Sequence, residues 1–172
     1  IASVAQLAVT SRTQSMEHAW QAMHSDNSGE TDKWQLIPAS HPVGTTVVIK
    51  ELFYNTPARK KFMRSQKSEL RHIVRLVETL ALSQFDMSFS LMHEGKYKCQ
   101  LPVADHWQEI EKRIGTVLGG EFLKHSMHID QCSADMRSHG WIGLPQYTRA
   151  ATDQQYCFVN NRLVKDKVLI QA

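Results

Sequence analysis

The segment between Gly44 and Phe62 constrains the fold of this chain more than any other, because it joins a strand, a turn and a basic helix without a linker. Its first part, 45–50, is rich in β-branched residues, which favour a strand, and Gly44 supplies a backbone position without a Cβ. Asn55-Thr56-Pro57 then breaks the strand and begins a helix. The segment therefore predicts a strand that leads directly into a cationic helix.

Positive charge is concentrated immediately after this turn. The segment 59–75 has a charge of +6, whereas the whole chain of 172 residues has a net charge of only +3, so the remainder carries −3. Such concentration indicates an anionic partner for one surface, and DNA, RNA and lipid all fit it. The cations are Arg59, Lys60, Lys61, Arg64, Lys67, Arg71 and Arg75, against Glu69 alone.

A helix is predicted over 65–82, with an apolar face and an adjacent basic stripe. The apolar residues recur at spacings of three and four, which suits packing on a sheet. The stripe of Arg64, Lys67, Arg71 and Arg75 has two readings: the solvated face of an amphipathic helix, or a surface that binds phosphate. The apolar face consists of Leu70, Ile73, Val74, Val77, Leu80 and Ala81.

The rest of the pattern predicts an α+β fold with two domains, 1–101 and 102–172. In the first, a helix ends near residue 5, strands that form an antiparallel meander follow, and a hairpin turns at His93-Glu94-Gly95. In the second, an acidic helix over 107–118 ends at Gly119-Gly120 and is followed by strands. The predicted strands are 7–12, 19–24, 33–37, 45–50, 88–92, 96–101, 126–130, 135–144 and 155–159.

Composition excludes several classes of protein. With 42% hydrophobic and 22% charged residues the chain is a folded domain, not a disordered tail. Cys99, Cys132 and Cys157 form no Cys-x-x-Cys pair, which argues against a disulfide framework and a zinc ribbon. His125 and His128 with Cys132 do not converge as metal ligands, so no metal site is predicted. No hydrolase or P-loop motif is present, and we predict no catalytic residue.

The ends of the chain predict a segment of a larger, intracellular protein. It opens on Ile1 without an initiator Met and closes on the apolar run 168–170. No signal peptide is visible, and no apolar run approaches the roughly 18 residues of a membrane helix. We therefore expect no association with a membrane.

The segment 44–62 closely resembles the fourth conserved motif of the MutL family of DNA mismatch repair proteins. Gly44-Thr45-Thr46, the strand, and the run Leu-Phe-Tyr-Asn-Thr-Pro-Ala-Arg at 52–59 are all present. The resemblance continues at 1–13, which is similar to the segment after the third ATP-binding motif of the family, and at 155–167. The family's glutamate, asparagine, Asp-x-Gly-x-Gly and Gly-Phe-Arg-Gly-Glu-Ala-Leu motifs do not occur here, and we expect them upstream of Ile1.

The resemblance implies the C-terminal part of a GHKL-type ATPase sandwich followed by part of a ribosomal-protein-like α/β domain. The parent protein is then a slow ATPase that binds ATP and magnesium, and no cofactor is expected on this segment alone. Thr45 occupies the place from which GHKL proteins point a hydroxyl toward adenine. A threonine that opens a strand is equally well explained as a good β residue, so both readings stay open.

The resemblance also implies a groove that binds DNA without sequence preference, because cations that neutralise phosphates do not read bases. Arg64 matches one DNA-contacting arginine of the family, and Lys167 matches another with the charge kept but the guanidinium lost. Arg71 and Arg75 are assigned only to solvent. Together with the basic run after the predicted Asn160-Asn161 turn, the predicted DNA-binding residues are Arg59, Lys60, Arg64, Lys67, Arg162, Lys165 and Lys167.

The function implied is that of an ATP-dependent matchmaker in bacterial mismatch repair. Its implied partners are DNA, the mismatch-recognition protein MutS, the nuclease MutH, a DNA helicase and a second copy of itself, in the cytoplasm and at the nucleoid. One alternative is a non-enzymatic module that binds nucleic acid, including RNA. Another is a fragment of a type II topoisomerase ATPase subunit, against which the Leu-Phe-Tyr-Asn-Thr-Pro-Ala-Arg run argues.

Overall fold

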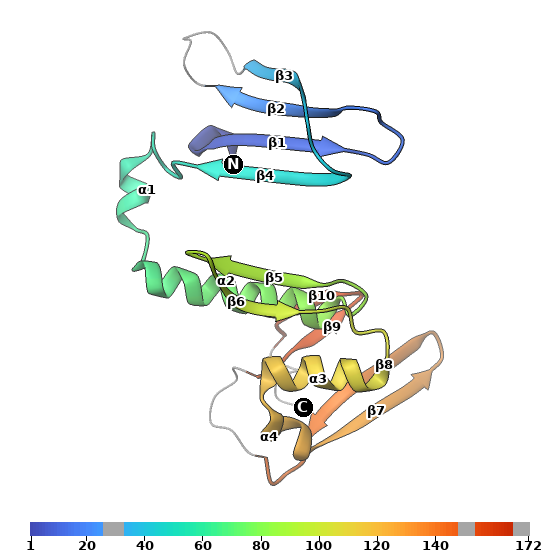
Figure 1. The fold of residues 1–172 in the computed structure, drawn as a ribbon. Helices are drawn as coiled ribbons and strands as arrows, with labels where there is room; N and C mark the ends of the chain where they lie inside the picture. Colours follow the sequence, from blue (N-terminus) through green and yellow to red (C-terminus); the bar gives the residue numbers. More distant parts are fainter. Residues whose placement is uncertain (26–32, 148–153, 167–172) are drawn as a thin grey trace. The chain divides into compact units, whose positions relative to one another are not determined.

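The polypeptide divides into two units, Ile1–Ser65 and Gln66–Ala172. The computed structural model describes residues 1–25, 33–147 and 154–166 (Figure 1). The division at 65 and 66 lies upstream of the predicted domain boundary at 101 and 102, because the helix that begins at Gln66 packs within the second unit. The predicted boundary itself remains a prediction.

The first unit is built on a four-stranded antiparallel sheet in the order β3-β2-β1-β4. A short 3₁₀ helix, η1 (Ala2–Val4), precedes the sheet where the end of a helix was predicted. The four strands occupy the predicted segments with ends shifted by one or two residues. They are β1 (Gln6–Arg12), β2 (Ala19–Ser25), β3 (Lys33–Ala39) and β4 (Gly44–Lys50).

The expected meander is wrong in its last step, since β4 pairs with β1 and not with β3. The connection 40–43 carries the chain from one edge of the sheet to the other. Three strand spacings amount to about 14 Å. Five Cα–Cα steps of up to about 3.5 Å can span that distance. A four-residue connection therefore does not require its flanking strands to be neighbours.

The turn after β4 leads into α1 (Pro57–Lys61), a helix of five residues that starts at proline as the sequence predicts. Proline suits the first helical turn because its missing N–H would have no partner there. The chain leaves α1 at Phe62, whose N–H bonds back to the carbonyls of Arg59 and Lys60. Helix α1 therefore includes only the first part of the basic stretch 59–75.

The second unit begins with the predicted amphipathic helix, α2 (Gln66–Ser83), which packs on the hairpin of β5 (Phe89–His93) and β6 (Lys96–Leu101). Its predicted apolar face is buried at Ala81, whereas Ile73 and Leu80 are about half exposed. The hairpin turn at Glu94-Gly95 has positive φ at both residues, as a tight hairpin turn requires.

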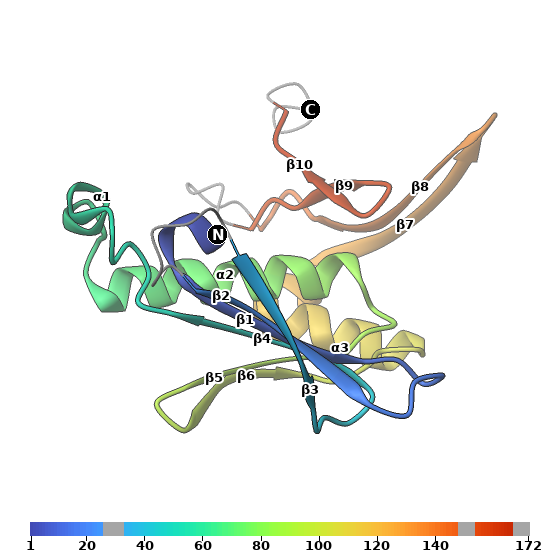
Figure 2. The ribbon, with the colours of Figure 1, turned by 90° about the horizontal axis from the view of Figure 1, so that it is seen from above.

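The core of this unit lies where α2 ends, around Leu82, Ile114 and Phe122. Helix α3 (Trp107–Leu118) has the predicted bounds, whereas the short helix α4 (Gly120–Lys124) was not predicted. Two further hairpins complete the unit (Figure 2). They are β7 (Ser126–Ser133) with β8 (Met136–Gly143), and β9 (Cys157–Val159) with β10 (Arg162–Val164), whose turn has φ of 49° at Asn160 and 62° at Asn161.

Candidate functional site

The predicted DNA-binding cations of the first unit follow one another along α1 and the turn after it. We call residues Arg59–Arg64 the basic segment. Arg59, Lys60 and Arg64 from the predicted set belong to it, and all three are exposed. Among the described residues, no carboxylate lies within ion-pair distance of Arg59, Lys60 or Lys61. These three side chains are therefore available to an external anion.

The remaining predicted cations belong to the second unit and do not form one cluster. Lys67 is exposed in the first turn of α2, and Arg162 and Lys165 are exposed on and just after β10. Phe158 of β9 packs against the core cluster of Leu82, Ile114 and Phe122. Within α2, Leu82 lies about 22 Å along the helix axis from Lys67, at about 1.5 Å per residue. Lys167 lies outside the described residues.

Thr45 lies at the start of β4, exposed, on the face of the sheet that also carries Val9 and Trp20. Its Oγ1 is 2.8 Å from the Oγ of Ser11, which also donates to the Gly44 carbonyl. The next hydroxyl along the strand, that of Thr46, lies on the opposite face and bonds to Nε2 of His41. Thr45 and Thr46 are thus chemically alike but point to opposite sides of the sheet.

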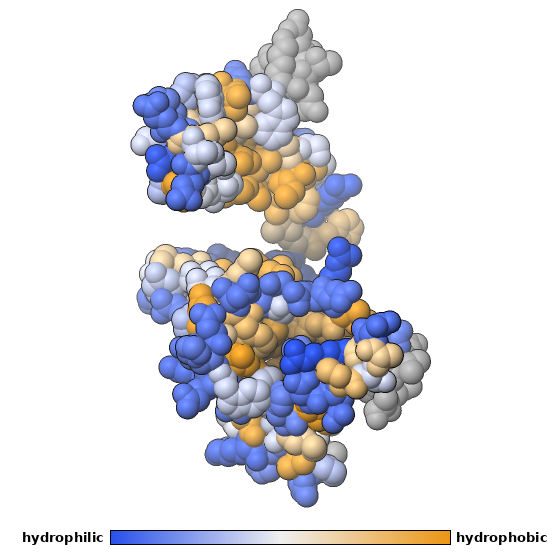
Figure 3. All heavy atoms as spheres, turned by 90° about the vertical axis from the view of Figure 1, so that its right-hand side faces the viewer, coloured by the Kyte–Doolittle hydropathy of each residue, from blue (hydrophilic) through white to orange (hydrophobic). Residues whose placement is uncertain are grey.

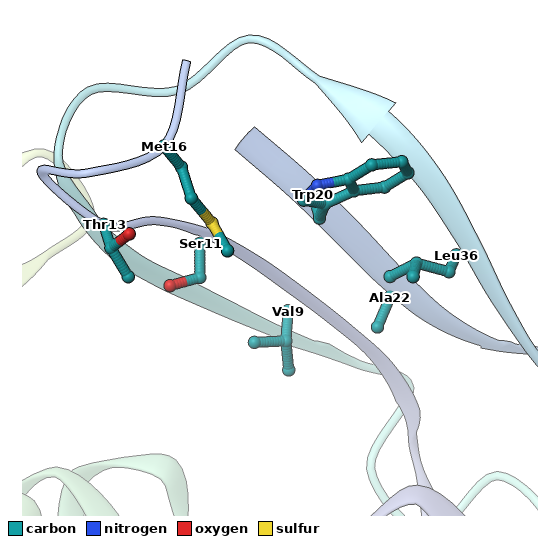
Figure 4. Close-up of a pocket in the computed structure, with 7 residues that line it drawn as sticks. All are labelled: Val9, Ser11, Thr13, Met16, Trp20, Ala22 and Leu36. Carbon is teal, nitrogen blue, oxygen red and sulfur yellow. The ribbon is translucent and has the colours of Figure 1, made fainter. Parts of the chain in front are cut away.

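An open pocket of about 300 Å³ lies on the Thr45 face of the sheet. Ser11 lines the pocket and pairs with Trp20 on one side and with Thr45 on the other, so Thr45 is the cross-strand neighbour of a lining residue. Met16 extends over it from the connection between β1 and β2 (Figure 4). The arrangement suits a flat ring that needs an apolar contact and a hydroxyl partner. The pocket is lined by Val9, Ser11, Thr13, Met16, Trp20, Ala22 and Leu36.

The apolar lining of the pocket continues across the same face onto β4. Val47 of β4, Val9 of β1, Ala22 of β2 and Leu36 of β3 form a continuous cross-strand row. The outer members, Val47 and Leu36, are more than half exposed. Hydrophobic surface is visible on this unit in Figure 3. The row marks a surface that other polypeptide or a ligand is suited to cover.

The two histidines considered as metal ligands make ring contacts. The imidazole of His128 lies against the indoles of Trp107 and Trp141, at 4.5 and 4.8 Å between centroids, and that of His125 stacks on Tyr147. Within the described ranges, no three His, Cys, Asp or Glu side chains gather as metal ligands would. Cys99, Cys132 and Cys157 are free thiols. No described helix is long and apolar enough to cross a membrane.

Sequence reasoning missed two features that position these elements. Arg113 is a buried cation of α3 that donates to a carbonyl at the end of α2. Its burial could have been predicted from its position beside Ile110 and Ile114, on the apolar face of a predicted helix. Asn55 was assigned only to a turn, yet its side chain donates to the carbonyl of Ser3. This bond could have been expected from the position of Asn55 just before a helix start, where side-chain hydrogen bonds to the backbone are common.

The sequence of the whole chain is similar to those of bacterial mismatch repair proteins. The DNA mismatch repair protein MutL of Aliivibrio salmonicida is 44% identical over all 172 residues, and those of Aeromonas salmonicida and Haemophilus influenzae are 44% and 40% identical. The chain spans only 26–27% of the length of these relatives. A family model described as DNA mismatch repair protein, C-terminal domain, matches residues 114–172.

The fold is similar to those of solved MutL ATPase domains. The Aquifex aeolicus MutL ATPase domain complexed with ADP superimposes with a TM-score of 0.76 at 21% identity, over 99% of this chain and 63% of that one. The ATPase domain of the A. aeolicus mismatch repair endonuclease gives a TM-score of 0.72, also over 99% of this chain and over 61% of that one. The predicted α+β fold class is confirmed, and the fold is that of the solved MutL ATPase domains.

Proposed function

This chain belongs to the MutL family of DNA mismatch repair proteins, and from that premise we propose that it supplies a DNA-binding surface to a mismatch repair ATPase. The observation that carries the proposal is the 40–44% identity to MutL relatives over every residue of the chain. The exposed cations of the basic segment add a physical reason, since they suit phosphate contact. The proposed DNA-binding residues are Arg59, Lys60, Arg64, Lys67, Arg162, Lys165 and Lys167.

The full-length protein in this proposal couples mismatch recognition by MutS to strand incision and excision. MutH and a DNA helicase act downstream, the protein works as a homodimer, and the setting is the bacterial cytoplasm and nucleoid. The domain boundary at 101 and 102 belongs to the same proposal. The support for these points is the family membership, because mismatch repair joins recognition, incision and excision in one reaction sequence.

The nucleotide in the proposal is ATP with magnesium, bound by the full-length protein, with Thr45 as the contact from this chain. A MutL ATPase domain of the same fold has been solved with ADP, which supports a nucleotide in this family. The Thr45 hydroxyl is 2.8 Å from that of Ser11, which lines an open, mostly apolar pocket on the same face of the sheet, and this supports the proposed contact. The magnesium ligands are expected in parts of the protein other than these residues.

The DNA-binding proposal is tested by measuring duplex affinity against salt concentration for the full-length protein. Replacing Lys60 or Arg64 by Glu is expected to weaken binding and to reduce the slope of log K against log salt by about one for each phosphate that is no longer neutralised. Lys167→Glu is expected to do the same. Arg71→Glu is the matched control, because it makes the same change of charge at an exposed position of α2. It is expected to change the slope less. Equal slopes for all four variants contradict the assignment.

The nucleotide contact is tested with the two neighbouring threonines. Thr45→Val keeps the β-branched shape and removes the hydroxyl, so the affinity for a non-hydrolysable ATP analogue is expected to fall about fivefold, the value of one net hydrogen bond. Thr46→Val removes the hydroxyl on the opposite face and is expected to leave that affinity within twofold. Equal effects of the two substitutions contradict a direct contact by Thr45.

A further inference from the structure

Phe62, inside the basic segment, is the most exposed large hydrophobic side chain in the described part of the chain. It is 85% exposed, and no other large hydrophobic residue described exceeds 72%. Single exposed hydrophobic residues are common on protein surfaces, so exposure alone does not indicate a function. The surroundings of Phe62 are unusual, however, because it follows the three cations at 59–61 directly and lies two residues before Arg64.

The backbone of Phe62 is fixed by the last turn of α1. Its N–H donates to the carbonyl of Arg59 at 3.1 Å, and the N–H of Met63 donates to that of Lys60 at 3.3 Å. Phe62 has a helical φ of −84° and ψ of −5°. The ring therefore projects from an ordered position, and a ligand that contacts it does not have to order the backbone first.

The ring of Phe62 makes no aromatic contact within the residues that the structure describes. Phe122 and Phe158, in contrast, each lie beside a tyrosine ring, at 5.9 and 6.5 Å between centroids. Both of these phenylalanines belong to the core of the second unit or pack against it. Phe62 is thus open to a flat partner from outside the described residues.

A cation lies beside this ring on the same side of α1. Arg59 and Phe62 are three residues apart at the end of the helix, a spacing that places the two Cβ atoms about 5 to 6 Å from each other. A nucleotide presents a phosphate and a flat base side by side. The guanidinium suits the phosphate and the ring suits the base. Surfaces that bind single strands combine cations with aromatic rings in this way.

We propose that Phe62 stacks on an unpaired base of the DNA whose phosphates the basic segment neutralises. An unpaired base is required, because bases in a duplex already stack on their neighbours and offer no free face. Stacking releases no counterions, so this contact adds affinity that does not depend on salt. The inference rests on the proposed function, since the cations of the same segment must hold the strand.

The test measures binding of the full-length protein to an oligothymidylate and to a relaxed, covalently closed circular duplex. Phe62→Ala is expected to raise the dissociation constant of the oligothymidylate about fivefold or more, the usual effect of losing one base–aromatic stack. The duplex constant is expected to stay within about twofold, because its bases are paired. The slope of log K against log salt is expected to be unchanged for both probes, because Phe62 carries no charge.

Two further variants separate stacking from simple apolar contact. Phe62→Leu keeps an apolar side chain and removes the flat ring, so it is expected to lose as much affinity for the oligothymidylate as Phe62→Ala. Met63→Ala is the matched control, because it removes an exposed apolar side chain at the next position. It is expected to change the constant by less than about twofold. A loss in Phe62→Ala that Phe62→Leu restores indicates contact with other polypeptide and overturns the proposal.

A direct readout remains informative where Phe62→Ala lowers the thermal midpoint of the protein. Phe62→Trp keeps a ring that stacks on bases, so its affinity for the oligothymidylate is expected to stay within about twofold or to increase. A base stacked on an indole quenches its fluorescence. Saturation with the oligothymidylate is therefore expected to quench this variant more than the unmodified protein. Equal quenching of the two proteins overturns the proposal.

The outcomes separate the inference from the function on which it rests. Salt-sensitive DNA binding that Lys60→Glu weakens and Phe62→Ala leaves unchanged overturns the stacking contact, and the DNA-binding proposal stands. Equal losses of oligothymidylate and duplex affinity in Phe62→Ala also overturn the stacking contact. Absence of salt-sensitive binding to either probe by the unmodified protein overturns the proposed function, and the inference falls with it.

Discussion

Arg113 shows how one buried residue joins three parts of the second unit. Its Nη1 donates to the carbonyls of Ala81 and Gln84 at 3.0 and 2.8 Å, and its Nη2 donates to those of Met87 and Pro102. Burial lowers the pKa of this guanidinium, and Asp86 opposes the shift, yet arginine keeps its charge at neutral pH. The carbonyl oxygens at the end of a helix also favour a cation. Arg113 thus supplies the hydrogen-bond donors that water would otherwise provide to the carbonyl groups at the end of α2.

Replacing Arg113 by Met is expected to lower the free energy of unfolding by about 3 kcal/mol, because buried carbonyls that lose a donor cost about 1 kcal/mol or more each. Chemical denaturation followed by fluorescence of Trp107 and Trp141, in the same unit, measures the change. Lys112→Met, one position earlier and exposed on the same helix, is the control and is expected to change stability by less than about 0.5 kcal/mol. Equal effects of the two variants contradict a stabilising role for the guanidinium.

A second residue-scale prediction concerns pH and the ion pair of Asp130 with Arg137, which are 2.6 Å apart on the β7–β8 hairpin. The hydrogen bond from Arg137 lowers the pKa of Asp130. A carboxyl whose pKa falls on folding stabilises the protein above its unfolded pKa, and this contribution is lost as the pH drops through the lower, folded value. The pair is exposed, so the effect is small.

Asp130→Asn is therefore expected to lower the unfolding midpoint slightly at pH 6, and the difference from the unmodified protein is expected to shrink below about pH 4. Thermal unfolding at several pH values measures it. Asp135→Asn, in the turn of the same hairpin, serves as the control. A difference that grows toward acid pH contradicts the assignment.

At the scale of elements, the junction of α3 and α4 depends on one backbone conformation. Gly119 has a φ of 94° and a ψ of 145°, a region that only glycine occupies readily, and its N–H caps α3 through the Gly115 carbonyl. The next residue, Gly120, begins α4, and a methyl side chain at this position would meet no neighbouring element within 4 Å. Two adjacent glycines thus have different structural roles.

Gly119→Ala is expected to destabilise the protein by about 1 to 3 kcal/mol, the cost of a strained residue. Gly120→Ala is expected to be neutral or stabilising by up to about 1 kcal/mol, since alanine favours a helix and restricts the unfolded chain. Denaturant midpoints of the two variants measure the contrast. Similar losses in both contradict the different roles of the two glycines.

The elements also show what the sequence could predict. Local signals sufficed for α3, for the β5–β6 hairpin and for the Asn160-Asn161 turn, because periodicity and turn chemistry are contained in a few neighbouring residues. The pairing of β4 with β1 and the bond from Asn55 to Ser3 join residues far apart in the sequence, which local patterns do not encode. The same limit applies to the site: the pattern identified the cations and Thr45, but not Ser11 beside Thr45 or the separation of Lys67 from β9.

At the scale of the whole molecule, both units expose large hydrophobic side chains. Val47, Leu36 and Trp34 of the first unit and Met136 and Ile142 of the second are among the exposed hydrophobic residues. Large exposed apolar patches mark surfaces that are covered by other polypeptide or that promote aggregation. The relatives are about four times as long as this chain, so they have polypeptide available to cover such surfaces.

The isolated 172-residue chain is accordingly expected to bind the dye ANS strongly and to self-associate, whereas the full-length protein is expected to bind little dye per residue. Replacing Val47 and Leu36 together by Thr, a β-branched polar residue, is expected to reduce both signals, because both residues lie in the exposed cross-strand row. Dye fluorescence measures the binding of ANS, and sedimentation velocity measures self-association. Equal dye binding per residue in the isolated chain and the full-length protein contradicts the prediction.

The order β3-β2-β1-β4 has a consequence for synthesis on the ribosome. The meander of β1, β2 and β3 can form as soon as residue 39 has left the exit tunnel, but the open edge of β1 waits for residues 44–50. During that interval β1 presents unpaired N–H and C=O groups to other nascent chains. The four-residue connection keeps the interval short: at about 5 to 20 residues per second, β4 follows β3 within about two seconds.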